Sequence, residues 1–569
     1  MPFLAKEHID VPTKDLLSWY FDNPQFDHDD PVYIDAANKA RSYTARQARE
    51  IIERLCAGFK AAGLKKGDVV CLHSFNDVDY PVIVNGVVAF GGIFCGTNPS
   101  YTPYEIKHAI KAARVNFFIV EPELVKNVLT AAEESGIPKS NVLVFEKPGQ
   151  DVPPGMRSWR TLLEHGKSDW ERFDDLETAK NTDAARLFSS GTTGLPKAAV
   201  ISHYNLIAQY RMVNDWNPKP FARSNLVPMP CFHVAVAPGV HFSPLRNGRP
   251  CYIMRRFELE PYLRYMSEYR ITDMGIVPPI AIVLINSPHL TSKYPLKHVR
   301  SAACGAAPLD RHAQERLQRL LPPDAPITQV WGMTETTCIA TMVPYPTMDA
   351  TGSVGIPCPS LDLKLVDDAG ADVTGYDVRG ELCVRGPTVI RGYLGGVGQD
   401  SWDDEGYFHT GDIAFCKREN GYWYIVDRKK ELIKVRGFQV APPELEAVLL
   451  SHPSIVDAGV IGVKSSTLQS SNTSTTITSS SGATTTDNAT ELPRAYIVRR
   501  PNDAAASKLS VKDVMSYVAE KVARYKWLQG GIVFVEAIPK NPSGKILKRV
   551  LREWAEKEMK TEGRAVAKL

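Results

Sequence analysis

The chain has 569 residues, which is too long for a single hydrophobic core and predicts two or more domains. Its formal net charge of +3 gives no large basic field for nucleic acid, and its hydrophobic share of 44% is that of an ordinary globular protein. The ten cysteines form no CxxC pair and show no metal-ligand spacing with histidine, which indicates reduced core thiols of an intracellular protein.

The N-terminal stretch MPFLAKEHIDVPTKD has no apolar signal core. The most apolar run, VIVNGVVAFGGIFCG at 82–96, is broken by Asn85 and by internal glycines. It is shorter than the roughly 20 residues that a membrane span needs. We therefore expect a buried helix and turn there, and no membrane span.

Strands and helices alternate through most of the N-terminal part. A helix is predicted at 44–62, and short buried strands are predicted at 69–75, 115–121, 141–146 and 271–279. This order predicts α/β layers with parallel strands.

After Leu361 the pattern changes. Short alternating strands are predicted at 361–367, 380–386 and 421–427, and a compact α+β tail follows. The predicted fold class is therefore α/β: a large N-terminal domain of layered α/β subdomains with a small β-rich subdomain, plus a small mobile α+β C-terminal domain. The boundary follows the last of these strands, which gives domains 1–429 and 430–569.

The segment 465–490 consists almost entirely of Ser, Thr, Asn and Gly. It has little apolar surface to offset the entropy of ordering, so we expect a disordered insert. It separates two predicted strands at 458–463 and 494–498.

The most informative stretch is LFSSGTTGLPKAAVISHYN at 187–205. Glycines let backbone N–H groups turn inward, hydroxyls add donors, and a lysine adds positive charge, which suits a loop around a polyphosphate. The loop residues are Ser189, Ser190, Gly191, Thr192, Thr193, Gly194 and Lys197. The spacing is not that of a Walker loop, and a Ser/Gly surface turn is the alternative.

SSGTTGLPK resembles the phosphate loop of the acyl-adenylate-forming (AMP-binding) enzymes, which include acyl-CoA synthetases, 4-coumarate–CoA ligases, beetle luciferases and peptide-synthetase adenylation domains. Four more segments match that superfamily in order: WGMTETT at 331–337, GYFHTGDIA at 406–414, DRKKELIKVRGFQVAPPELE at 427–446 and NPSGKILKRVL at 541–551. Their wording is most similar to the 4-coumarate–CoA ligase-like acyl-CoA ligases. The resemblance implies an N-terminal AMP-binding and acyl-binding domain, a C-terminal lid domain, and a hinge at Lys430.

Adenylation places negative charge on phosphate oxygens, so it needs cations and donors placed beforehand. The resemblance assigns Mg²⁺ to Glu335, catalytic roles to Lys545, Lys434, Thr334 and His233, and the ribose hydroxyls to Asp412. It implies an ATP/AMP site formed by the loop residues above with Gly305, Ala306, Ala307, Trp331, Gly332, Met333, Thr334, Asp412, Arg428, Gln439 and Lys545. For CoA it implies Lys434, Arg436 and Gly437.

The implied acyl pocket consists of His233, Val234, Ala303, Cys304, Thr336 and Ile339. These residues are mostly small or apolar, which favours an uncharged acyl tail, aryl or medium-chain aliphatic. The expected activity is that of an ATP-dependent acyl-CoA ligase (acid–thiol ligase, AMP-forming). It forms acyl-AMP and pyrophosphate and then transfers the acyl group to CoA. The alternatives are an adenylating enzyme that serves a carrier protein, a luciferase-like oxygenase, and a non-catalytic nucleotide-binding regulator.

The chain ends in Ala567-Lys568-Leu569, which resembles the SKL-type peroxisomal address. We therefore expect recognition by a peroxisomal import receptor and a peroxisomal location, and otherwise a cytoplasmic one.

Overall fold

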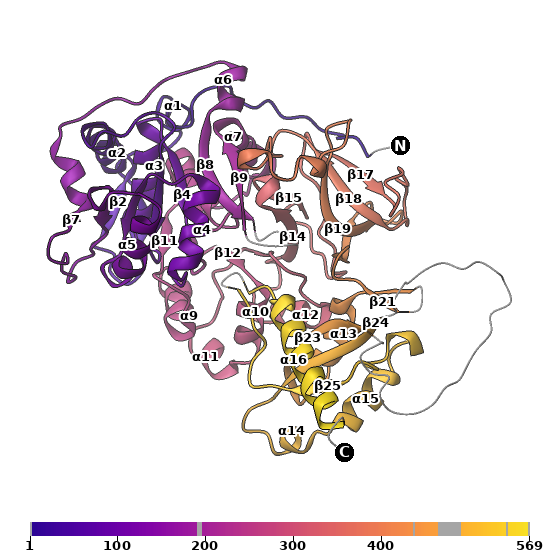
Figure 1. The fold of residues 1–569 in the computed structure, drawn as a ribbon. Helices are drawn as coiled ribbons and strands as arrows, with labels where there is room; N and C mark the ends of the chain where they lie inside the picture. Colours follow the sequence, from indigo (N-terminus) through magenta and orange to yellow (C-terminus); the bar gives the residue numbers. More distant parts are fainter. Residues whose placement is uncertain (1–2, 190–195, 436–437, 465–490, 542–543, 567–569) are drawn as a thin grey trace. The chain divides into compact units, whose positions relative to one another are not determined.

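The computed structural model describes residues 3–189, 196–435, 438–464, 491–541 and 544–566 (Figure 1). The chain forms two compact units. One comprises Met1–Thr410 and Cys416–Tyr424, and the other comprises Gly411–Phe415 and Ile425–Leu569.

The first sheet of the first unit is mostly parallel, and only β8 and β9 pair antiparallel within the described residues. Its strand order is β7 (Arg157–Ser158), β6 (Val142–Val144), β5 (Phe117–Val120), β3 (Val69–His73), β4 (Ile93–Gly96), β8 (Asp183–Ser189) and β9 (Lys197–Ser202). The helices that precede, connect or follow these strands are α2 (Ala45–Ala61), α3 (Asp79–Ala89), α4 (Pro103–Ala113), α5 (Val125–Glu134), α6 (Leu176–Asn181) and α7 (His203–Tyr210).

Helix α2 shows how the sequence sets these elements. Thr44 and Gln47 form a reciprocal capping box that satisfies free N–H groups of the first turn. Ala48, Ile52 and Leu55 recur at helical spacing and are fully buried. The predicted helix at 44–62 is confirmed.

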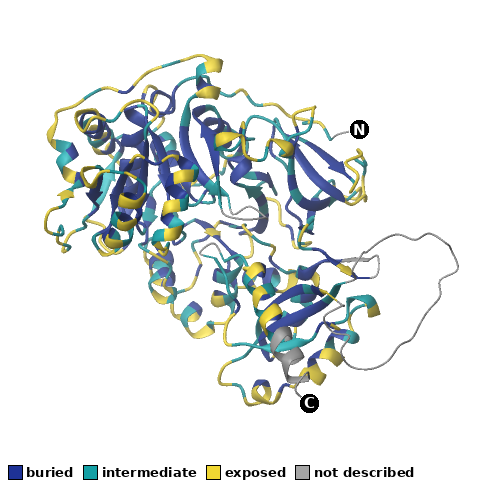
Figure 2. Cartoon of the chain, viewed as in Figure 1, coloured by how far each residue is buried: buried dark blue, intermediate teal, exposed yellow. Residues whose placement is uncertain are grey.

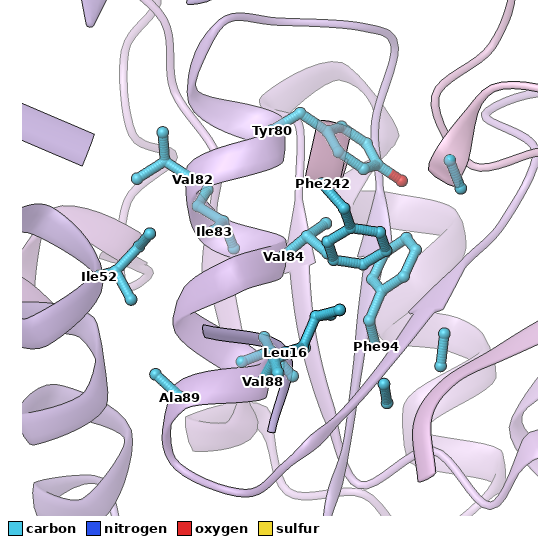
Figure 3. Packing of buried hydrophobic residues seen from close by; sticks show 14 of the residues in the cluster. Leu16, Ile52, Tyr80, Val82, Ile83, Val84, Val88, Ala89, Phe94 and Phe242 are labelled. Atoms are coloured by element: carbon cyan, nitrogen blue, oxygen red, sulfur yellow. The ribbon is translucent and has the colours of Figure 1, made fainter. Parts of the chain in front are cut away.

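Helix α3 is buried on every side, which explains its apolar sequence. Tyr80 and Val84 from this helix lie in one cluster with Phe94 and Phe242 (Figure 3). Here the expectation of a helix and turn at 82–96 needs correction. The run ends in strand β4, because residues 93–96 pair with β3, and Phe94 and Cys95 also pair with β8.

The second sheet carries parallel strands at its centre. Its order is β16 (Ile356–Pro357), β15 (Cys338–Met342), β14 (Ile327–Met333), β13 (Ser301–Cys304), β12 (Asp273–Ile276), β10 (Asn225–Val227), β11 (Cys251–Ile253), β1 (Pro31–Asp35) and β2 (Ser42–Thr44). The remaining helices of the unit are α1 (Leu16–Phe21), α8 (Ser243–Asn247), α9 (Leu259–Glu268), α10 (Pro278–Ile285), α11 (Pro288–Lys293) and α12 (Arg311–Gln318). In Figure 2 the strands are coloured mostly as buried, whereas many helices carry exposed residues on their outer faces.

The third sheet contains β17 (Asp362–Val366), β18 (Gly380–Arg385), β19 (Phe408–Cys416) and β20 (Trp423–Arg428). It corresponds to the predicted β-rich segment, and the chain passes from one unit to the other within β19 and β20.

The second unit is α+β. Its strands form the hairpin β21 (Ile433–Val435) and β22 (Phe438–Val440), and a sheet of β23 (Ile455–Lys464), β24 (Glu491–Arg499) and β25 (Ile532–Phe534). Its helices are α13 (Pro442–Leu450), α14 (Ala504–Lys508), α15 (Val511–Ala519) and α16 (Lys548–Val566). The predicted α/β fold class, with a large N-terminal and a small C-terminal domain, is confirmed.

The insert 465–490 lies outside the described residues. Its flanking strands are antiparallel, and Lys464 is paired directly with Glu491. All ten cysteines, each in a described segment, are free thiols. Over the described ranges, no helix combines the length and the apolar character that crossing a membrane requires.

Candidate active site

The last hairpin of the first sheet fixes the two ends of the predicted phosphate loop. β8 and β9 are antiparallel, so Ser189 and Lys197 lie opposite each other where the strands leave the sheet. Ser190, Gly191, Thr192, Thr193 and Gly194 lie outside the described residues. A glycine- and hydroxyl-rich segment between two fixed ends suits the wrapping of backbone N–H groups around a phosphate.

Tyr393, which the sequence analysis missed, connects this hairpin to Glu335. Its backbone pairs with Ala199 of β9, and Lys197 Nζ lies 4.8 Å from the centre of its ring. Its hydroxyl donates to Glu335 Oε1 at 2.5 Å. Burial and the Glu335 carboxylate raise the pKa of Tyr393, so the hydroxyl stays protonated and remains a donor.

Glu335 lies in a short turn after β14 and is only 2% exposed. Its Oε2 is buried and has no hydrogen-bond partner among the described residues. Because Tyr393 holds the other oxygen, this atom is available to a cation. The described residues contain no group of three or more His, Cys, Asp or Glu that could hold a metal. Mg²⁺ is usually bound by one or two carboxylates together with substrate phosphates, and Glu335 fits that arrangement.

Left-handed backbone occurs in the turn after β13 and again between the end of β14 and the first residue of β15. Ala306 has φ +69°, and Thr337 and Cys338 have φ +45° and +109°. Such conformations are costly for residues with a side chain and concentrate at functional sites. At Gly332 an added Cβ would lie 1.5 Å from the Cys338 carbonyl oxygen, so only glycine lets β15 return this closely.

The residues implied for the nucleotide in the first unit follow neighbouring parallel strands. Gly305, Ala306 and Ala307 come after β13, and Trp331, Gly332 and Met333 end β14, which is its parallel neighbour. Thr334 begins the next turn, and both Trp331 and Thr334 are buried. The structure therefore brings these two segments to one edge of the second sheet, where parallel sheets bind ligands.

Two adjacent residues of β13 face opposite ways. Cys304 packs in the core with Ala302 and Ile276, whereas Ala303 is half-buried on the other face. Ala303 is paired with Gly275 of β12, which is exposed although it lies inside the sheet. A Cβ at Gly275 would meet nothing within 4 Å. Of the two implied pocket residues on β13, only Ala303 therefore faces open space.

Gly275 is a residue that the sequence analysis missed. Its signal is a glycine in the middle of an apolar strand, which often marks a site where something else approaches the backbone. With Ala303, its partner on β13, it forms a strip of small residues on one face of the second sheet, which we call the glycine strip.

His233 follows β10, the strand next to β12 in the second sheet. Its Nδ1 accepts a hydrogen bond from the Ala235 backbone N–H at 3.1 Å, which leaves Nε2 to carry the proton. Burial lowers the pKa of His233 to about 4, so the ring is neutral at pH 7. It can line a pocket or donate a hydrogen bond, but it supplies no positive charge.

The other implied pocket residues differ in exposure. Val234 is buried and Ile339 is half-buried. Thr336 is fully buried, and its hydroxyl bonds to the backbone of Met333, so it stabilises the turn that carries Glu335.

The second unit brings together polar residues of three motifs. Asp412 lies inside β19 and is buried, and its Oδ1 is 3.4 Å from Arg428 Nε at the end of β20. Lys545 lies near both residues. Burial, with the positive charge of Arg428, lowers the pKa of Lys545 to about 8, while Glu431 and Asp412 act in the opposite direction.

The residues implied for the second half-reaction lie on the β21–β22 hairpin. Lys434 is exposed, and its backbone N–H donates to Glu491 Oε2 at 3.0 Å. Arg436 and Gly437 lie outside the described residues, and for Gln439 only its place in β22 is described. Lys430 is an exposed residue in the turn between β20 and β21.

Residues 21–394 match the AMP-binding enzyme family, and residues 482–545 match the AMP-binding enzyme C-terminal domain. The chain therefore belongs to the AMP-binding enzyme family, which confirms the resemblance drawn from the five motifs.

Relatives match over nearly the whole chain. It is 46% identical to a phenylacetyl-CoA ligase of Aspergillus niger, over 97% of this chain and 99% of the relative. It is 48% identical to an acyl-CoA synthetase of Alternaria alternata, over 95% of this chain and 90% of the relative. It is 32% identical to 4-coumarate–CoA ligase 3 of Arabidopsis thaliana, over 96% and 92%.

Solved structures show the same fold. An anthranilate CoA ligase in complex with anthranoyl-AMP matches with a TM-score of 0.80 at 21% identity, over 96% of this chain and 98% of that one. ATP-bound MatB from Rhodopseudomonas palustris matches with a TM-score of 0.80 at 24% identity, over 95% and 98%.

Proposed function

We propose that this protein is an ATP-dependent acyl-CoA ligase whose preferred acids are uncharged and aryl, of the arylacetic or benzoic type. Family membership and the full-length similarity to CoA ligases support the reaction class. The glycine strip is the observation that supports the acid class, because Gly275 and its partner Ala303 leave room for a flat or extended tail and carry no charge.

The first unit supplies the nucleotide chemistry in this proposal. The phosphate loop between Ser189 and Lys197 binds the β- and γ-phosphates, and Thr334 donates to the α-phosphate. Glu335, whose buried Oε2 has no hydrogen-bond partner among the described residues, would hold Mg²⁺ together with the nucleotide phosphates. When bound, Mg²⁺ would neutralise charge on the leaving pyrophosphate. Tyr393 keeps Glu335 in place by its hydrogen bond.

The second unit supplies two lysines for two steps. Lys545 stabilises negative charge when the carboxylate attacks the α-phosphate, and Lys434 serves the transfer to CoA. Because they lie in different motifs of one unit, we propose that the unit turns about Lys430 between the steps. Asp412 accepts from the ribose hydroxyls, and Arg428 lies beside it.

The test measures pyrophosphate release with phenylacetate, benzoate, 4-coumarate, hexanoate, malonate and phenylalanine, each with and without CoA. We expect pyrophosphate release with the aryl acids and little release with malonate and phenylalanine, which carry a second charged group. Thioester should form only when CoA is present. Gly275→Leu should reduce kcat/KM for the aryl acids by about tenfold to a hundredfold, since it fills the open space. Cys304→Ala is the matched control, because its side chain faces the core. If Gly275→Leu has the same kcat/KM as the wild type for every acid, the assignment of Gly275 to the acyl pocket is contradicted.

Medium-chain aliphatic acids are the second candidate. The open space at Gly275 also suits an extended alkyl tail. A kcat/KM for hexanoate above that for every aryl acid would favour this candidate.

We also propose a peroxisomal location, supported by Ala567-Lys568-Leu569, which lie outside the described residues. The last ten residues fused to a fluorescent reporter should give puncta that overlap a peroxisomal marker. Diffuse fluorescence would count against this proposal, as would unchanged puncta of the full-length protein after removal of Leu569.

A further inference from the structure

Lys548, the first residue of α16, is buried among three carboxylates of the second unit. Its Nζ lies 3.2 Å from Glu431 Oε2, 3.7 Å from Asp427 Oδ2 and 3.9 Å from Glu446 Oε1. Its side chain is only 7% exposed. We call these four residues the Lys548 cluster. They come from β20, the turn after it, α13 and α16, so one ammonium group joins four separate segments.

The cluster contains more acid than Lys548 can neutralise. Burial raises the pKa of Asp427 to about 7, and the pKa of Glu446 is raised for the same reason. Glu446 Oε1 also accepts from the Val460 N–H, whereas Asp427 Oδ2 is buried without a hydrogen-bond partner among the described residues. Burying several carboxylates together costs free energy unless a cation stays among them.

One carboxylate of the cluster, Glu431, also acts on the adenylation lysine. Glu431 is the ion-pair partner of Lys548, and it is also the largest influence that favours the charged form of Lys545. Arg428 and Lys548 oppose it, and Asp412 supports it. Asp457, near Glu446, is paired with Lys540 at 2.7 Å. Glu431 therefore interacts with two cations: the buried Lys548 and Lys545, the lysine proposed to act in adenylation.

Three further contacts connect the cluster to the proposed site. Asp427 Oδ1 accepts from the backbone N–H of Arg428 at 2.7 Å, and Arg428 contacts Asp412. The Lys545 loop is closed by the Asn541 side chain, whose Oδ1 accepts from the Lys545 N–H at 2.8 Å. This loop leads directly into α16, so the start of α16 limits where Lys545 can lie.

We propose, on the basis of the proposed ligase function, that Lys548 is a positioning residue for adenylation. It holds Glu431 and Asp427 at the start of α16, and through them it sets the place and the charge state of Lys545. Lys548 itself does not touch the substrates. Its loss should therefore slow adenylate formation and leave acyl transfer from a supplied acyl-adenylate intact.

The experiment compares the two half-reactions of the full-length protein. Lys548→Met should slow pyrophosphate release by about tenfold to a hundredfold, since a small displacement of a reacting group has that effect. Transfer from a supplied acyl-adenylate to CoA should change by less than about threefold. Lys548→Arg should recover most of the adenylation rate, because it restores a cation.

A pH profile separates positioning from a merely structural role. When Lys548 is replaced by methionine, the pKa of Lys545 should rise. A nearby positive charge is removed, and Glu431 no longer has Lys548 as its ion-pair partner. The fall of the adenylation rate at alkaline pH should therefore move to higher pH in Lys548→Met and stay near the wild-type position in Lys548→Arg. The matched control is Arg549→Met, whose side chain is 80% exposed, and it should behave as wild type.

Asp427→Asn gives a second route if Lys548→Met does not fold. Asparagine keeps the acceptor for the Arg428 N–H but removes the charge, so it should slow adenylation with transfer unchanged. Equal slowing of both half-reactions in the folded variants, or an unmoved alkaline limb, would overturn the proposal. If the wild type releases no pyrophosphate with any acid, the proposed function fails instead, so the two failures can be distinguished.

Discussion

Lys545 and Lys434 lie in the same unit but in opposite surroundings. Lys545 lies among Arg428, Asp412 and Glu431, and burial lowers its pKa to about 8. Lys434 is the exposed residue of a short hairpin strand whose two neighbours, Ile433 and Val435, are buried. A lysine held among buried charges suits a reaction that develops charge at a fixed point. A lysine on an exposed strand suits the capture of a large, separately arriving molecule such as CoA.

The largest expected effect tests the buried lysine. Lys545→Ala should reduce acyl-adenylate formation by about a thousandfold or more, because the charge that meets the α-phosphate is lost. It should still convert supplied acyl-adenylate and CoA to thioester. Single-turnover pyrophosphate release and thioester formation, measured separately, check this. The comparison breaks down if both steps slow equally.

Lys434→Ala should show the reverse pattern. Adenylate and pyrophosphate should form at near wild-type rates, and transfer to CoA should fall by about tenfold to a hundredfold, the value of one hydrogen bond to a charged group. The exposed Lys126→Ala, in the first unit, serves as the control for loss of a surface charge. Slower pyrophosphate release in Lys434→Ala would remove the division of labour.

The two half-reactions should also differ in their response to pH. Lys545 is charged below its pKa of about 8, so the adenylation rate should fall as pH rises through that value. The decline should approach about tenfold per pH unit, as expected for loss of one proton. His233, with a pKa of about 4, stays neutral throughout and should not contribute. A transfer step with the same alkaline limb would show that Lys545 serves both reactions.

The smallest effect concerns the insert. Lys464 and Glu491 are directly paired, so a short turn can replace 465–490 without moving either strand. Both half-reactions should stay within about threefold of wild type, because loop shortening changes closure free energy by only about 1–2 kcal/mol. Since Glu491 also accepts from the Lys434 N–H, any change should appear in transfer before adenylation. Complete loss of activity in a folded variant would contradict this.

The sequence predicted the α/β class, the family and most strands of the layers, because periodicity and five ordered motifs are local properties. Its strand predictions at 69–75 and 141–146 agree with β3 and β6. It misjudged the end of the apolar run at 82–96, since a short apolar segment does not reveal whether it continues a helix or pairs with distant strands. The candidate site residues could be identified from the order of the motifs along the chain alone.

The tertiary structure decided which neighbours those residues have. Tyr393 meets Glu335 only because a segment 58 residues further along the chain pairs with β9. Ala303 and Cys304 look alike in sequence, and only the pairing of β13 shows which of them faces open space beside Gly275. The Lys548 cluster likewise draws its carboxylates from three other segments. Motifs and periodicity are set by adjacent residues, whereas burial, charge and pKa depend on groups that only folding brings within a few ångströms.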